Sequence, residues 1–96
     1  MLEAAITKAI MDTLREQFPD CLVIRKCWGT VMGVAGDPDL YGCYRGRFFA
    51  MEVKQPGEKP TKLQQARIEE WRRAGALVGV VHSREEALAL FEGLPC

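Results

Sequence analysis

A carboxylate and a lysine lie close together near the end of a predicted strand. Residues 47–54 (RFFAMEVK) are rich in aromatic, β-branched and other apolar side chains, which predicts a central strand. Side chains alternate along a strand, so Glu52 and Lys54 share a face that is otherwise apolar. Burying such groups is costly unless they are paired or bind a metal. They stand about 6.6 Å apart along the strand, so both can reach one small site.

Three more polar residues interrupt the apolar pattern of their own elements. Asp39 follows a proline at the start of the preceding predicted strand. Gln64 shares a helix face with Ile68 and Trp71, and Glu3 lies at the head of the apolar stripe of the first predicted helix. Polar residues on apolar faces are expected mainly at functional or strained sites.

Each of these residues also has an ordinary structural explanation. Asp39 can serve as a turn residue, and Gln64 completes a capping box with Thr61. A first-turn acid such as Glu3 suits the helix dipole. The Glu52 and Lys54 side chains can form an internal ion pair or lie on a solvent-exposed strand face.

Together the acids and the lysine resemble the equipment for hydrolysing a phosphodiester. Two carboxylates at the ends of adjacent strands, Asp39 and Glu52, can hold a hard cation such as Mg²⁺ through oxygen ligands. A lysine beside the metal can orient or help to activate a water molecule. The metal lowers the pKa of that water and stabilises charge on a phosphate.

The elements that position these residues follow the order α-β-β-β-α-β-α. Helices are predicted over residues 2–18 and 62–74 and after Ser83, which forms a predicted capping box with Glu86. Strands are predicted over 21–28, 40–44, 47–54 and 76–82. A tight turn at residues 45–46 makes a hairpin of two strands. The next helix and the apolar run 76–82 complete a right-handed βαβ unit. We therefore expect a small mixed β-sheet flanked by helices, and a glycine-rich loop over 29–36.

Size and composition narrow the class of protein. The 96 residues make one domain, 1–96, with a net charge of zero, so nucleic acid would have to be held by local patches. No apolar run reaches the roughly 20 residues of a membrane span, and residues 1–12 do not read as a signal peptide. We expect a cytoplasmic protein, in a bacterial or phage-infected cell. The four cysteines form no C-x-x-C pair and are expected to be unpaired thiols.

Three motifs in this order resemble a virus-type replication-repair nuclease (VRR-NUC) domain. They are G-x-P-D-L at residues 36–40, E-V-K at residues 52–54, and T-x-x-Q opening a helix that ends in Ala-Gly-Ala at residues 74–76. These domains belong to the PD-(D/E)-x-K nuclease superfamily, so the resemblance implies a restriction-endonuclease-like fold. It covers nearly the whole chain, from the first helix to residue 83.

The resemblance also implies roles for individual residues. It makes Asp39 and Glu52 the acids that bind Mg²⁺ or Mn²⁺, with the backbone carbonyl of Val53. Lys54 resembles the catalytic lysine. Gln64 matches the glutamine of the family's crossover helix, and Glu3 is similar to a helix-one glutamate that supports the metal.

The implied activity is metal-dependent endonuclease cleavage of branched DNA, such as Holliday junctions, by a homodimer. Candidate DNA-binding residues are Arg25, Lys26, Arg45, Arg47, Lys59 and Lys62. Such phosphate contacts would make binding strongly salt-dependent. Three alternatives stay open: a non-catalytic nucleic-acid-binding module on the same fold, a purely structural interaction domain, and a sequence-specific restriction-type nuclease.

Overall fold

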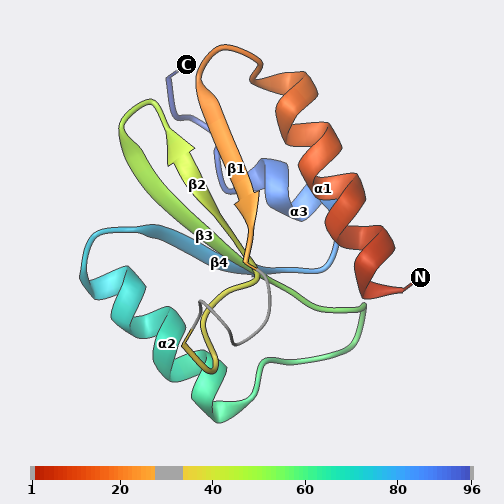
Figure 1. Ribbon diagram of the computed structural model, residues 1–96, viewed down its shortest axis with the longest axis vertical. Helices are drawn as coiled ribbons and strands as arrows, with labels where there is room; N and C mark the ends of the chain where they lie inside the picture. The colour runs from red at the N-terminus through yellow and green to blue at the C-terminus, as the bar shows by residue number, and fades with distance from the viewer. Residues whose placement is uncertain (1, 28–33, 96) are drawn as a thin grey trace.

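Three helices and four strands follow one another in the predicted order (Figure 1). The structure is a computed structural model that describes residues 2–27 and 34–95. The elements are α1 (Glu3–Gln17), β1 (Leu22–Lys26), β2 (Leu40–Tyr44), β3 (Arg47–Val53), α2 (Lys62–Arg73), β4 (Leu77–Val81) and α3 (Arg84–Ala89). Each prediction is therefore confirmed to within a few residues, except that Trp28 and residues 29–33 of the expected loop lie outside the described residues.

The four strands form one mixed sheet in the order β1-β2-β3-β4. β1, β2 and β3 are antiparallel neighbours, whereas β3 and β4 are parallel. Arg45 and Gly46 join β2 to β3 with positive φ angles of 50° and 86°. Two consecutive positive angles are the mark of the two-residue type I′ hairpin turn. Helix α2 connects the two parallel strands β3 and β4, as the predicted βαβ unit requires.

The helices cover both faces of this sheet, but unequally. Figure 1 shows α1 and α3 on one side and α2 on the other. The larger core lies under α1 and α3, where Ile10 and Leu14 pack with Phe49 and Met51 of β3 and with Phe91. A smaller cluster lies under α2. The fold is therefore the expected mixed sheet flanked by helices.

The face under α2 is the face that carries the polar residues of β3. Ala50 packs there against Ile68 and Val78, and alternation places Glu52 on the same side two residues later. The predicted division of β3 into two faces is thus confirmed. After the exposed Arg47, one face is apolar core, whereas the other begins with aromatic and small residues and ends in a carboxylate.

Two local predictions need correction. The Ser83 hydroxyl accepts a hydrogen bond from the backbone N–H of Glu86 at 3.1 Å, as in a capping box. However, the Glu86 carboxylate does not return to Ser83, because it binds the His82 backbone N–H at 3.1 Å and ring Nδ1 at 3.0 Å. The prediction of unpaired cysteines holds for Cys27 and Cys43 but is wrong for Cys21, which is disulfide-bonded.

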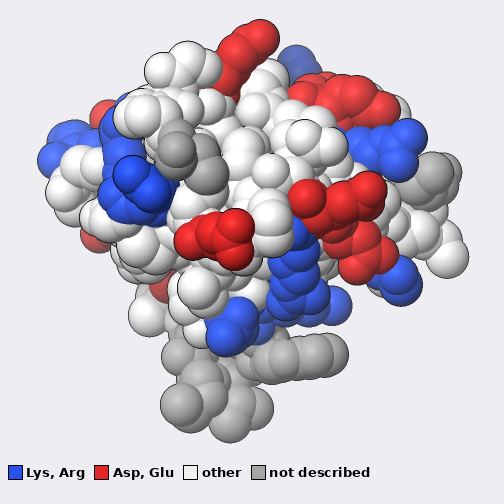
Figure 2. All heavy atoms as spheres, turned by 90° about the horizontal axis from the view of Figure 1, so that it is seen from above, with Lys and Arg blue, Asp and Glu red and all other residues white. Residues whose placement is uncertain are grey.

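No helix within the described residues is long and apolar enough to cross a membrane. The face seen in Figure 2 carries charged side chains of both signs, in several separate groups. This distribution agrees with the net charge of zero, and it limits any interaction with nucleic acid to local groups of basic residues.

Candidate active site

The β2–β3 hairpin brings the two candidate metal-binding acids together. Its register pairs Leu40 with Met51, so the residues one step beyond, Asp39 and Glu52, lie across from each other. The Asp39 carboxylate is held in place because its Oδ2 accepts a hydrogen bond from the backbone N–H of Val53 at 3.0 Å. Thirteen residues of sequence therefore suffice to bring both carboxylates to one end of the sheet.

Glu52 is the most deeply buried charged side chain of the site, with 2% of its surface exposed. Its Oε2 accepts a hydrogen bond from Nε2 of Gln64 at 3.0 Å and lies 3.9 Å from Nζ of Lys54. Its Oε1 is buried and has no hydrogen-bond partner among the residues that the structure describes. Buried polar atoms are normally satisfied, so Oε1 stands out as an unsatisfied polar atom.

Burial and neighbouring charge raise the pKa of Glu52 from 4.5 to about 8. Desolvation is the largest cause, followed by the charge of Asp39 and a hydrogen bond that the two acids share. The ammonium of Lys54 acts in the opposite direction, and the charge of Glu3 raises the pKa further. The site without a cation therefore disfavours the ionised form of Glu52, and the single lysine does not offset this effect.

The side chain of Gln64 both caps the start of α2 and binds Glu52. Its Oε1 accepts a hydrogen bond from the Thr61 backbone N–H at 2.9 Å, while the Thr61 hydroxyl accepts from the Gln64 N–H at 3.1 Å. The predicted capping box is therefore confirmed. The amide nitrogen of the same side chain remains free to donate to Glu52, so the structural and functional interpretations hold together.

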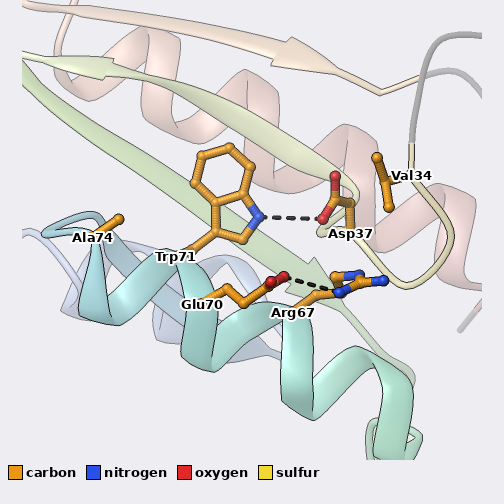
Figure 3. Close-up of a pocket in the computed structure, with 6 residues that line it drawn as sticks. All are labelled: Val34, Asp37, Arg67, Glu70, Trp71 and Ala74. Carbon is orange, nitrogen blue, oxygen red and sulfur yellow. Dashed lines mark hydrogen bonds and ion pairs between the residues drawn. The ribbon is translucent and has the colours of Figure 1, made fainter.

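The loop that carries Asp39 is seated on helix α2. Gly36 adopts a φ of +85°, and a Cβ atom there would lie 2.7 Å from Cγ of Leu63. Glycine is required because both the angle and the close approach exclude a side chain. One residue later, Oδ1 of Asp37 accepts a hydrogen bond from the indole N–H of Trp71 at 3.3 Å, as Figure 3 shows. Asp37 therefore has its hydrogen-bond partner on α2.

The candidate DNA-binding residues lie in three places. Lys26, at the end of β1, and Lys59 and Lys62, around the start of α2, belong to the end of the fold that carries the acids. Arg45 and Arg47 lie at the hairpin turn, and Arg47 is about 17 Å from Glu52 along β3. Arg25 is exposed on β1, opposite Tyr41 in the β1–β2 register. The structure thus does not gather these six residues around one point.

Three aromatic side chains were not singled out by the sequence pattern. Phe48 and Trp71 stack with their ring centroids 4.9 Å apart, and Tyr41 stacks on Phe48 at 6.4 Å. All three lie on the α2 side of the sheet, which also carries Glu52. The sequence signals for them were the alternation that placed Phe48 on the face of Glu52 and the helical spacing that placed Trp71 on the face of Gln64.

A solved structure described as a VRR_NUC domain resembles this chain over 97% of both chains, with a TM-score of 0.72 and 30% sequence identity. The chain belongs to the VRR-NUC family. This is a family of nuclease-type domains, so the predicted family and fold are confirmed, and nucleic acid is a partner in keeping with them. No protein-family model matches the sequence, and no curated protein matches it.

The donor set of this VRR-NUC domain fits a divalent cation. Within residues 2–27 and 34–95, no group of three or more acidic, histidine or cysteine side chains is arranged to hold a metal. The ligands that the side chains can supply are therefore the two carboxylates of Asp39 and Glu52. Their mutual repulsion and the unpartnered Oε1 of Glu52 are what a hard cation with oxygen ligands would relieve.

Proposed function

We propose that this VRR-NUC domain is a Mg²⁺- or Mn²⁺-dependent endonuclease that hydrolyses phosphodiester bonds in branched DNA. The observation that carries the proposal is the buried, unpartnered Oε1 of Glu52, which lies in a site with Asp39 and Lys54. An acceptor that is desolvated and unsatisfied is costly in a purely structural role. In a metal site the same atom is a ligand.

Asp39 and Glu52 would hold the cation, and the Val53 carbonyl is our third proposed ligand. When bound, Mg²⁺ or Mn²⁺ would lower the pKa of a coordinated water and stabilise charge on the phosphate. The Asp39 carboxylate is already oriented by the Val53 N–H, and Gln64 orients Glu52. Both ligands are therefore held by hydrogen bonds before any cation arrives.

Lys54 is our candidate for the catalytic lysine. Its side chain is only 15% exposed and its Nζ lies 3.9 Å from Glu52 Oε2. An ammonium held in such a poorly solvated position can orient an attacking water or stabilise negative charge on the phosphate. Its backbone is fixed as well, because the Lys54 N–H donates to the Val81 carbonyl at 3.0 Å. Glu3, whose charge is felt at Glu52, is proposed to support the cation from α1.

The proposal extends to the substrate and the assembly. DNA phosphates would contact Lys26, Lys59 and Lys62 at the end of the sheet that carries the acids. Arg25 lies next to Lys26 on β1, whereas Arg45 and Arg47 lie at the hairpin turn. A substrate that touches both ends therefore has to extend along the sheet. A branched duplex, bound by a homodimer whose two-fold symmetry places two sites on two strands, meets this requirement.

The test is cleavage of labelled junction, flap and linear DNA with Mg²⁺, with Mn²⁺ and with EDTA. We expect metal-dependent cleavage of the branched substrates, and Lys54→Ala should reduce the rate by about 100-fold or more. Lys8→Ala is the matched control, because Lys8 is exposed on α1 and pairs with Asp12. Absence of cleavage by the wild type, or full activity of Lys54→Ala, would refute the catalytic proposal.

A further inference from the structure

An aromatic surface lies beside the acids on the α2 side of the sheet. It consists of Tyr41, Phe48 and Trp71, with 42% of Tyr41 and 37% of Phe48 exposed. The rings are nearly parallel, with interplanar angles of 20° between Tyr41 and Phe48 and 13° between Phe48 and Trp71. α2 covers Ala50 and the β4 side of this face but leaves the Tyr41 side open.

The aromatic surface borders a cavity of about 530 Å³. This volume lies within the usual range for sites that enclose a small organic group. The rest of the lining includes Asp37 and Pro38 of the motif loop, and Lys26 at the end of β1. The hydrogen bond from Trp71 to Asp37 ties the aromatic surface to the loop that carries Asp39, so the two are positioned together.

The distance between the aromatic surface and the acids is short. Tyr41 follows Asp39 by two residues on β2, about 6.6 Å along the strand. This is the length of about two stacked base steps at 3.4 Å each. A strand whose phosphate lies at Asp39 and Glu52 therefore has a base within reach of the Tyr41 ring.

We infer that the aromatic surface binds an unpaired nucleobase next to the scissile phosphate. The inference rests on the proposed function, and it specifies the substrate as branched DNA with an unstacked nucleotide at the cleavage point. Flat, exposed rings stack on any base, because every base has a π face. Arg25, opposite Tyr41 in the sheet register, and Lys26 supply the positive charge that the adjoining phosphates require.

The test compares two DNA substrates that differ only in a three-nucleotide flap carrying 2-aminopurine. Binding is measured by fluorescence in EDTA, so that cleavage does not contribute. We expect tighter binding of the flap substrate than of the blunt duplex, with a change in 2-aminopurine emission. Tyr41→Leu should weaken flap binding by about 5- to 150-fold and leave duplex binding within about twofold, whereas Tyr41→Phe, which keeps the ring, should match the wild type.

Other outcomes overturn the inference and identify the alternative. Equal flap affinity for Tyr41→Leu and the wild type refutes stacking at this surface. If Tyr41→Leu instead turns a sedimenting dimer into a monomer and weakens both substrates equally, the surface binds a second copy of the chain. Phe48→Leu repeats the comparison at a second ring. Flap binding by a wild type that never cleaves with Mg²⁺ or Mn²⁺ refutes the nuclease proposal but retains the stacking surface.

Discussion

Replacing Glu52 by glutamine should stabilise the metal-free domain while abolishing its response to metal. The substitution keeps the size of the side chain and the acceptor for Gln64. It removes an ionisable group of which only 2% is exposed to solvent. In the absence of metal, the charge on this group is opposed by desolvation and by Asp39. Removing it therefore relieves the folded state.

The size of the effect follows from the pKa of Glu52, which rises from 4.5 to about 8. Between these values the folded protein holds the proton more tightly than the unfolded chain, so stability falls as the pH rises. Each pH unit above 4.5 costs about 1.4 kcal/mol, which amounts to at most about 3.5 kcal/mol at pH 7. Water penetration around buried charges lowers such figures. We therefore expect Glu52→Gln to gain about 1 to 3 kcal/mol at pH 7 and almost nothing at pH 4.5.

The assay is urea unfolding in EDTA at pH 4.5, 7 and 8, with Glu92→Gln as the control at an exposed position. Saturating Mn²⁺, added at about 100 times its dissociation constant, should then stabilise the wild type by about 2.7 kcal/mol and leave Glu52→Gln unchanged. Equal stability of the wild type and Glu52→Gln at every pH would show that Glu52 is not a strained charge. An undiminished Mn²⁺ response in Glu52→Gln would remove it from the metal site.

Three further perturbations separate the parts of the site. Gly36→Ala should cost about 1–2 kcal/mol of stability because of its positive φ, and it should lower the cleavage rate because the new methyl group displaces the motif loop from α2. The control Gly93→Ala, at a φ of +80° with open space around it, should lose stability without losing cleavage. Equal cleavage rates for the two variants would refute the loop argument. Thr61→Ala should cost about 1 kcal/mol of stability with cleavage intact, while Gln64→Ala should lose both, as urea unfolding and cleavage rates will show. Hydrogen bonds to Glu86 and to a backbone carbonyl raise the pKa of His82. The stability that protonated His82 contributes should therefore be present below pH 6.5 and be lost above its pKa in the folded protein. Thermal unfolding of the wild type and His82→Gln at pH 5.5 and 9 measures this, and an equal difference at both pH values would contradict it.

The sequence pattern predicted the hairpin and the βαβ unit because these depend on local signals. Alternation in β3, the type I′ turn and the Thr61 capping box each lie within a few residues. The same signals placed Asp39, Glu52 and Gln64 on converging element ends. The contacts of Glu52 then followed from topology, since hairpin register and helix start are both fixed locally.

Hydrogen bonds between residues far apart in the sequence could not be predicted from these local patterns. His82 had no evident partner in the sequence, yet its Nε2 lies 3.0 Å from the Glu58 carbonyl, 24 residues away. The Trp71 to Asp37 hydrogen bond spans 34 residues. Only one of the two hydrogen bonds of the predicted capping box at Ser83 is present, because the Glu86 carboxylate binds His82 instead of the Ser83 backbone N–H. In the first two cases the hydrogen-bond partner of a side chain was determined by the tertiary structure and not by its neighbours in the sequence.

The two-residue turn at Arg45 and Gly46 determines how this domain can change during evolution. One residue added to the turn would shift the pairing of β2 with β3, and a one-residue slip sends every side chain to the opposite face. Glu52 would then move into the apolar core under α1, away from Asp39. The loop from residue 54 to α2 is under no such constraint, because length changes in surface loops are tolerated. We therefore expect lineages of this domain to vary in that loop while keeping the hairpin turn at constant length.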